Sequence, residues 1–105
     1  MSQKQQNFVT AKQASNMRGG INIEGTATEL GEPRVVNLKA GGVIDTRELT
    51  LVDDEGGEIK LKLWGDDIKL VQAGSRIKIL NGYTNTFKGD VSLTKGKFGK
   101  LEVVS

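Results

Sequence analysis

The chain has 105 residues, of which 36% are hydrophobic and 27% charged, and this length predicts one domain with one core. It contains neither Cys nor His, which excludes disulfides, thiolate zinc sites and catalysis by a cysteine nucleophile or a histidine base. The net charge is +2, but residues 21–58 carry −6 and residues 59–105 carry +5. The second half therefore favours an anionic partner, or else presents a solvated lysine-rich surface. No apolar run approaches the ~20 residues that span a bilayer, and the first residues lack a signal-peptide core, so we expect a cytoplasmic protein.

The first half of the chain predicts a polar arm followed by strands. Residues 1–17 are polar and rich in Gln, and we expect them to form a flexible arm that precedes a domain over residues 18–105. Over residues 21–28, apolar and polar side chains alternate with a period of two, which is typical of a half-buried strand. Residues 35–38 are a candidate for resumed pairing, and residues 43–52 predict the second strand.

Residues 53–57 form an acidic turn with two glycines, and residues 59–64 follow with the most regular alternation in the chain. With the strand before the turn, these residues predict a hairpin. The acidic turn lacks the alternating oxygen ligands and the terminal Glu of a calcium loop, so we expect a solvated turn and no metal site. Residues 66–73 predict the one helix, with Asp66 or Asp67 as its cap.

The last third of the chain predicts two more strands. The fourth strand begins at Arg76, bends at residues 81–82 and continues to a turn at residues 88–90. The fifth strand begins at Val91, is interrupted by the basic, glycine-containing segment 95–100, and then closes the chain.

This order of elements predicts an all-β fold. Three strands, a short helix and two further strands match the five-stranded OB-fold barrel, with its one short helix between strands three and four. A small SH3-like barrel is the structural alternative, but the helix and the chain length favour the OB fold. OB barrels bind oligonucleotides across strands two and three and the loops that flank them.

Three aromatic side chains are candidates for base stacking. Trp64 is the single Trp, and it lies on the opposite side of its strand from the apolar residues assigned to the core. Tyr83 and Phe87 lie in a polar stretch among Asn, Thr and Lys, and each ring that stacks contributes ~1–3 kcal/mol per base. The alternatives are that Trp64 caps the end of the barrel and that Phe87 fills its interior. We expect Phe98 to pack its hairpin against the body, with stacking as the alternative.

Basic side chains accompany these aromatics. The ones that we expect to neutralise phosphates are Lys60, Lys62, Lys88, Arg47, Lys95, Lys97 and Lys100. Lys60 and Lys62 share a strand face with Trp64, because alternate residues of a strand point the same way. Lysine is a point charge that suits non-directional phosphate contact, and the scarcity of Arg predicts weak sequence preference.

Four segments together resemble the OB domain of archaeal single-stranded DNA-binding proteins, a family related to replication protein A and to the simple single-OB proteins of animals. The four segments are residues 52–66 with Leu63-Trp64-Gly65, residues 74–79, residues 81–93 with Phe87-Lys88-Gly89, and residues 99–103. The opening residues 21–34 fit the family's first strand. The resemblance therefore covers about residues 17–104.

The resemblance implies which aromatics stack. The family stacks bases on one aromatic after the third strand and on two around the turn between the fourth and fifth strands. By position, these are Trp64, Tyr83 and Phe87. The second aromatic is often Trp in the family and is Tyr83 here, which implies a smaller platform and a lower affinity.

The residues and the resemblance together predict a protein that binds single-stranded DNA with little sequence preference and protects it in replication, recombination and repair. No catalytic residues and no cofactor are expected, because a nuclease on this barrel needs clustered carboxylates to hold its metal ions. We expect a nucleoid-associated monomer, with replication or repair proteins as further candidate partners. The alternatives left open are an OB domain that binds a partner protein and one that binds single-stranded RNA.

Overall fold

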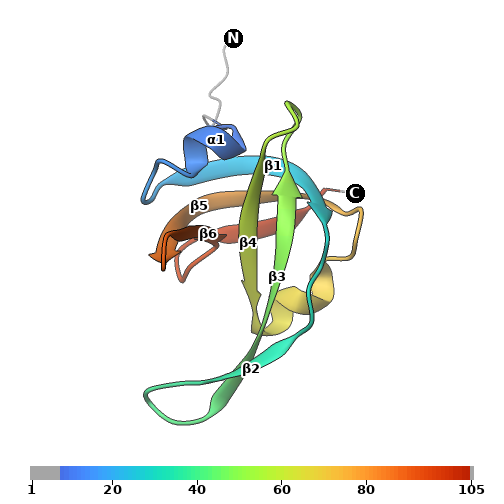
Figure 1. Ribbon diagram of the computed structural model, residues 1–105. Coiled ribbons are helices and arrows are strands. Elements are labelled where there is room, and N and C mark those ends of the chain that lie inside the picture. Colours follow the sequence, from blue (N-terminus) through green and yellow to red (C-terminus); the bar gives the residue numbers. More distant parts are fainter. Residues whose placement is uncertain (1–7, 105) are drawn as a thin grey trace.

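A computed structural model describes residues 8–104 of the chain, apart from the side chain of Phe87. The elements in chain order are α1 (Ala11–Ala14), β1 (Ile21–Thr28), β2 (Arg34–Asn37), β3 (Val43–Val52), β4 (Glu58–Trp64), the 3-10 helix η1 (Gly65–Leu70), β5 (Arg76–Phe87), β6 (Asp90–Thr94) and β7 (Lys100–Val103). Strands dominate the described chain (Figure 1), which confirms the predicted all-β class.

Five of the strands close into a barrel. β1 pairs with β3 on one side and with β5 on the other, and β3 pairs with β4 and β5 with β6, all antiparallel. The ring is completed by β4 and β6, which pair in parallel through residues 60–62 and 92–94. η1 lies between β4 and β5, which are the third and fourth strands of this ring in chain order. The strand order and the helix position are those predicted for the OB fold.

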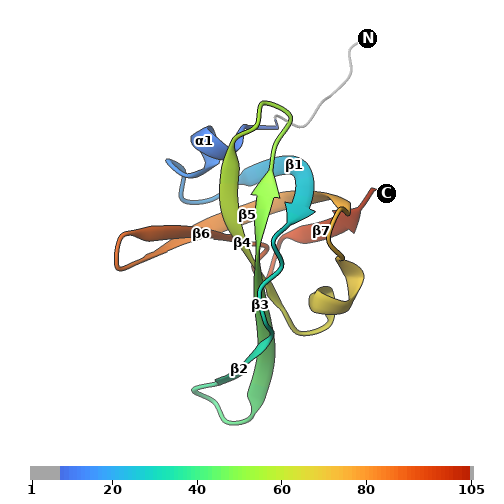
Figure 2. The ribbon, with the colours of Figure 1, turned by 45° about the vertical axis from the view of Figure 1, so that its right-hand side comes forward.

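Two short strands extend the ring. β2 pairs with residues 43–46 of β3, and the resulting hairpin projects beyond the barrel (Figures 1 and 2). β7 pairs with residues 77–80 of β5. From the sequence, residues 35–38 were only a candidate for strand pairing. The reason is that this strand buries few apolar side chains. Val35 remains 66% exposed, so no alternation of apolar and polar residues marks the strand.

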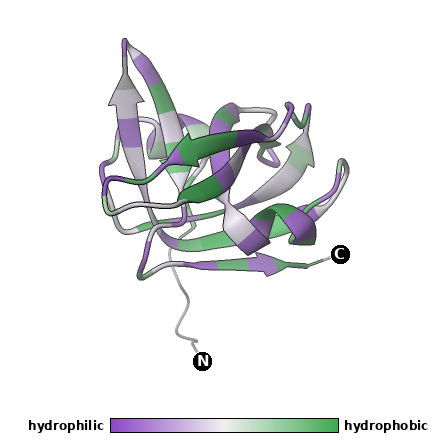
Figure 3. Ribbon diagram, turned by 90° about the horizontal axis from the view of Figure 1, so that it is seen from below, coloured by the Kyte–Doolittle hydropathy of each residue, from purple (hydrophilic) through white to green (hydrophobic). Residues whose placement is uncertain are grey.

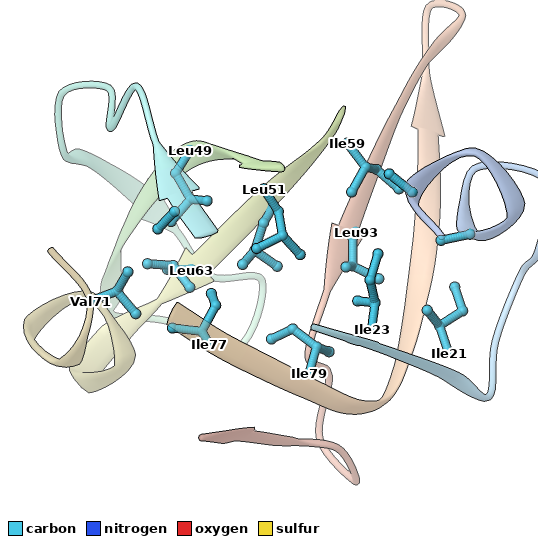
Figure 4. Packing of buried hydrophobic residues seen from close by; sticks show 14 residues of the cluster. Ile21, Ile23, Leu49, Leu51, Ile59, Leu63, Val71, Ile77, Ile79 and Leu93 are labelled. Carbon is cyan, nitrogen blue, oxygen red and sulfur yellow. The ribbon is translucent and has the colours of Figure 1, made fainter. Parts of the chain in front are cut away.

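The interior of the barrel is filled by the inward-facing residues of the ring strands. Every second residue of β1 is buried, and along the strands in Figure 3 hydrophobic and hydrophilic segments alternate in the same way. The largest fully buried side chains are Ile21, Ile23, Leu49, Leu51, Leu61, Ile77, Ile79 and Leu93. Figure 4 shows the labelled members of this cluster pointing into the interior, with Val71 beside η1. The alternation predicted over residues 21–28 and 59–64 is therefore confirmed.

The structure differs from the predicted flexible arm over residues 8–17, which pack on the barrel. Thr10 caps α1 through a capping box, in which its Oγ1 accepts from the Gln13 N–H and the Gln13 Oε1 accepts from the Thr10 N–H. Ala11 and Ala14 are fully buried members of the core. A single helical turn with two alanines carries too little apolar patterning to be recognised from sequence. Residues 1–7 of the predicted arm lie outside the described residues.

The predicted helix over residues 66–73 is shorter and starts earlier than expected. It is a 3-10 helix, Gly65–Leu70, and neither Asp66 nor Asp67 caps it, because both lie in its first turn. Gly65 adopts a φ of 60°, which turns the chain directly after β4. Val71 returns to an extended conformation and is buried in the core, so its burial ends the helix before the predicted residue 73.

Asp53 attaches the N-terminal segment to the barrel through hydrogen bonds. Its Oδ2 accepts from the Ala11 N–H at 2.6 Å, and its Oδ1 accepts from the Glu55 and Gly57 N–H groups at 2.9 and 2.8 Å. The hydrogen bond from Ala11, followed by those from Gly57 and Glu55, lowers the pKa of Asp53, against the opposing effects of burial and of the Asp54 charge. The acidic turn is therefore a structural anchor for α1.

We expect Asp53→Asn to lower the free energy of unfolding by about 1–3 kcal/mol at pH 7, because one amide group cannot accept from both sets of N–H donors. Urea denaturation measures this change. Asp54→Asn is the matched control, since the Asp54 side chain is 74% exposed in its ion pair with Arg76, and its effect is expected to be smaller.

The stabilisation by Asp53 also depends on pH. Because the folded pKa lies below the unfolded value of about 4, the stabilisation is complete above that pH and is lost as the pH falls through the folded pKa. The difference between the wild-type chain and Asp53→Asn should therefore shrink in acid. Equal stability of the two chains at pH 7 would contradict the anchoring role.

Candidate nucleic-acid interface

The outer face of the β3–β4 pair carries the predicted Trp and two of the predicted lysines. The antiparallel register sets Lys60 opposite Thr50, Lys62 opposite Glu48, and Trp64 opposite Thr46. Cross-strand partners lie on the same face of a sheet. Lys60, Lys62 and Trp64 therefore share one face, while the residues between them, Ile59, Leu61 and Leu63, are buried in the core.

Trp64 is held in place at the end of β4. Its indole Nε1 donates to the Oγ1 of Thr94 on β6, at 3.2 Å. The Nζ of Lys62 lies 5.5 Å from the centre of the indole ring, which is within the range of a cation–π contact. The side chain is half-buried, and it lines a hollow of about 340 Å³, hereafter the Trp64 hollow. The ring is therefore fixed at the edge of a surface depression.

Tyr83 lies in the same hollow, 19 positions further along the chain. In the β5–β6 pair it is the partner of Thr94, and its side chain is 40% exposed. Thr94 thus lies next to both aromatics. Its hydroxyl accepts the hydrogen bond from Trp64, and the strand register sets it opposite Tyr83. The third predicted stacking residue, Phe87, ends β5, and its side chain lies outside the described part of the structure.

Two further hollows adjoin the Trp64 hollow and share residues with it. One, of about 370 Å³, includes Phe98, Lys97 and Tyr83, and is hereafter the Phe98 hollow. The other, of about 320 Å³, lies towards the β2–β3 hairpin, where Arg34 and Lys62 line it. Because Tyr83 and Lys62 each line two of the three hollows, the hollows are neighbours on the surface, and together they are hereafter called the track.

The predicted phosphate-binding residues fall into different settings. On the outer face of β4, Lys60 is exposed with its Nζ 3.4 Å from the Thr50 Oγ1, and Lys62 lines the track. Lys97 lies over the Phe98 ring, with its Nζ 5.7 Å from the ring centre. Lys88 and Lys100 are exposed, the first in the β5–β6 turn and the second at the start of β7.

Lys95 and Arg47, two of the predicted phosphate-binding residues, make short polar contacts with other elements of the chain. The Nζ of Lys95 forms an ion pair with the Oδ2 of Asp67 on η1, at 2.9 Å. Arg47 lies opposite Leu63 on the face of β3 that points to the core, and its Nε donates to the Gly31 carbonyl at 2.6 Å. The Lys95–Asp67 pair and the Arg47 hydrogen bond were not predicted, because both join residues from separate elements.

The structure corrects the expectation for Phe98 and adds residues that the sequence analysis missed. Phe98 was expected to pack against the body, yet it is 81% exposed. Thr94 orients Trp64, but as an isolated polar residue it gave no indication of this role in the sequence. Gly96 lies against the Tyr83 ring, where a Cβ would overlap Cε1 and Cδ1. The glycines of the basic segment could have indicated the contact between Gly96 and Tyr83, since glycine permits a close approach of the backbone to a neighbour.

A second charged cluster lies at the end of the barrel beside α1. Arg76 donates from Nε to Glu24 and from Nη1 and Nη2 to Asp54, at 2.8 to 3.1 Å. The hydrogen bonds to Asp54 and Glu24 raise the pKa of Arg76, and Arg76 lowers the pKa of Asp54. With Asp53 bound to backbone N–H groups, the charged groups of Glu24, Asp53, Asp54 and Arg76 all have partners within the chain.

Comparison with known proteins gives relatives both in sequence and in structure, while no family model matches the chain. The chain is 34% identical, over 85 residues and 81% of its length, to the single-stranded DNA binding protein Ssb of Saccharolobus solfataricus. The match covers 56% of that protein, so the chain spans little more than half the length of this curated relative. The resemblance predicted from the sequence is therefore confirmed as a similarity to an archaeal protein of this class.

Solved structures with low sequence identity share the fold. A chain of a replication protein A heterotrimer bound to ssDNA superposes with a TM-score of 0.77 at 22% identity, over 97% of this chain and 25% of that chain. The replication factor A related protein from Methanobacterium thermoautotrophicum gives 0.67 at 21% identity, over 93% and 91% of the two chains. The OB domain of Ta0387 from Thermoplasma acidophilum gives 0.69 at 18%, over 91% and 80%. The chain therefore has the OB fold.

The helices give no sign of a membrane-spanning segment. Over residues 8–104, none of them has the length and the apolar character that crossing a membrane requires.

We expect Gly96→Ala to displace the Tyr83 ring and to destabilise the chain. Gly96 has a φ of 75°, so any other residue there costs about 1 kcal/mol or more in backbone strain, and the new Cβ would also overlap the ring. Gly56→Ala is the matched control, because Gly56 has a φ of 83° with open space around it. Thermal unfolding and the NMR shifts of the Tyr83 ring measure the two effects. Unchanged ring shifts in Gly96→Ala would contradict the close contact.

Proposed function

We propose that the chain binds single-stranded DNA with little sequence preference, by stacking bases on aromatic rings and neutralising phosphates with lysines. The observation that carries this proposal is the meeting of Trp64 and Tyr83 in one lysine-bordered hollow. An aromatic platform beside a positive groove is the arrangement by which OB folds hold single strands. The sequence relative, a single-stranded DNA binding protein, and the replication protein A heterotrimer bound to ssDNA support the same conclusion.

The proposed mechanism starts from the contacts of the unbound chain. Lys62 covers the indole of Trp64, so a base that stacks on this face displaces the ammonium group towards the strand's phosphates. The hydrogen bond to Thr94 keeps the indole in its orientation while Lys62 moves. Tyr83 accepts a neighbouring base, and Phe87 is the third proposed stacking residue. Lys60, Lys88, Lys97 and Lys100 add positive charge around the track, while Lys95 and Arg47 act mainly through their internal partners.

The proposal is one of binding without catalysis, by the domain predicted over residues 18–105, onto which α1 packs. The protein would act as a monomer in replication, recombination and repair, where it keeps single strands open and protected, and would meet replication or repair proteins there. The proposed location is the cytoplasm, at the nucleoid. A protein-interaction role is the alternative, and a peptide partner would then need acidic residues to face the lysines beside the aromatic rings.

The single Trp of the chain is the reporter for the first test. We expect oligo-dT to quench the fluorescence of Trp64 strongly, and duplex DNA to quench it weakly. Tyr83→Ala, which keeps the reporter, should weaken oligo-dT binding by about 1–3 kcal/mol, or roughly 5-fold to 150-fold. Tyr83→Phe is the control, since it keeps the ring and should retain most of the affinity.

The same titration separates the alternatives. Equal affinity for oligo-U and oligo-dT would make the chain an RNA-binding OB domain as much as a DNA-binding one. Failure of every nucleic acid to quench Trp64 or to bind in a mobility assay would contradict the proposal and favour a protein-interaction module.

Phosphate contact by Lys62 predicts a specific change in salt dependence. Each phosphate neutralised on a single strand contributes about −0.7 to the slope of log K against log salt. We therefore expect Lys62→Ala to make the slope shallower by about this amount. Lys12→Ala is the control, because Lys12 is exposed on α1 beside the Asp53 anchor, and its slope should match the wild-type value. Identical slopes for both variants would remove Lys62 from the phosphate contacts.

A further inference from the structure

Phe98 is the most exposed large hydrophobic side chain among the described residues, with 81% of its surface open to solvent. It lies in the loop between β6 and β7, where Lys97 holds its Nζ 5.7 Å from the ring centre. Exposure of a single apolar side chain is ordinary on a protein surface. Phe98, however, lies next to the proposed DNA track, on a loop that is held in place there. These two features point to a function for its exposed ring.

The loop that carries Phe98 is fastened to the barrel at three points. At its start, Lys95 is paired with Asp67 on η1. In its middle, Gly96 lies flat against the ring of Tyr83, where no Cβ would fit. At its end, Gly99 approaches β5 so closely that a Cβ would lie 2.8 Å from the Leu80 carbonyl oxygen. The backbone on both sides of Phe98 is therefore held against the barrel, while the side chain is exposed.

The Phe98 hollow continues the Trp64 hollow. Tyr83, Lys95 and Gly96 line both depressions, so Tyr83 is the boundary between them. Beyond Tyr83, the larger hollow of about 370 Å³ is bordered by an aromatic ring and an ammonium group, those of Phe98 and Lys97. The same two kinds of group, in Trp64 and Lys62, border the first hollow.

We propose that Phe98 and Lys97 form an additional nucleotide subsite, which extends the DNA track past Tyr83 along the β6–β7 loop. The base of the next nucleotide of the same strand stacks on Phe98, and Lys97 moves from the ring to the adjoining phosphate. The positive charge of the loop and its continuity with the Trp64 hollow favour a strand of nucleic acid as the occupant. This inference rests on the proposed function, because the subsite has meaning only for a strand that already occupies the Trp64 hollow.

The subsite is tested with Phe98→Ala and a series of oligo-dT lengths starting at about four nucleotides. For strands long enough to reach the loop, we expect the variant to bind roughly 5-fold to 150-fold more weakly than the wild-type chain. For the shortest strands that occupy Trp64 and Tyr83, the two chains should bind equally. Thermal unfolding of the variant should match the wild type, since the side chain that is removed is largely exposed.

Phe8→Ala is the matched control for this substitution. Phe8 is also exposed, at 41%, and the Nζ of Lys78 lies 5.7 Å from its ring centre, the same distance as in the Lys97–Phe98 pair. Phe8 lines a different hollow, with Asp53 and Arg76 at the acidic end of the barrel. Phe8→Ala should therefore leave the affinity for every strand length unchanged.

A fluorescent reporter gives an independent test. In a chain with Trp64→Phe and Phe98→Trp, all Trp emission comes from position 98. We expect long oligo-dT to quench this emission, and short oligo-dT to leave it largely unchanged.

The outcomes separate the two proposals. If the wild-type chain binds no oligonucleotide, the proposed function fails and the subsite fails with it. If the wild type binds but Phe98→Ala keeps its affinity for every length, and the reporter at position 98 is not quenched, the proposed function stands and the subsite alone is overturned.

Discussion

The closure of the barrel is the constraint on which the arrangement of the candidate interface depends. Because β1 pairs with both β3 and β5, the remaining gap in the ring can close only where β4 meets β6 in parallel. This pairing sets Lys62 beside Thr94, whose hydroxyl accepts from Trp64 and whose antiparallel partner is Tyr83. Two aromatics that are far apart in the chain thereby line one hollow. The core drives closure, since the inward residues of all five ring strands are buried together.

Much of this arrangement could be predicted from local sequence patterns. The regular alternation over residues 59–64 fixes which side chains of β4 point inward, and so placed Trp64, Lys60 and Lys62 on one outer face, as the register confirms. The acidic turn and its flanking strands identified the β3–β4 hairpin. The strand order, with one helix before the fourth ring strand, identified the OB fold. Each of these features depends on residues that are close together in the chain.

The features that could not be predicted involve contacts between distant residues or elements too short to show a pattern. α1 buries only two alanines and depends on Asp53, some 40 positions away, for its attachment. The exposure of Phe98 follows from how the loop is held by Lys95 and Gly99, so neither its composition nor its basic charge revealed it. The engagement of Arg47 with the Gly31 carbonyl likewise depends on where β3 crosses the chain after β1. Sequence thus indicates which residue types are available, and tertiary contacts decide which remain accessible.

Asp53 and Asp54 are bound within the chain beside α1, while the track is lined by lysines such as Lys62 and Lys97 together with Glu32, Glu48 and Asp67. The most direct test of the central claim, that single-stranded DNA lies across the Trp64 hollow, is an NMR map of the backbone amides during titration with oligo-dT. We expect the largest shifts at Lys62, Trp64, Tyr83 and Thr94, with little change in α1 or the Asp53 turn. Shifts confined to that acidic end, or no shifts at all, would contradict the claim.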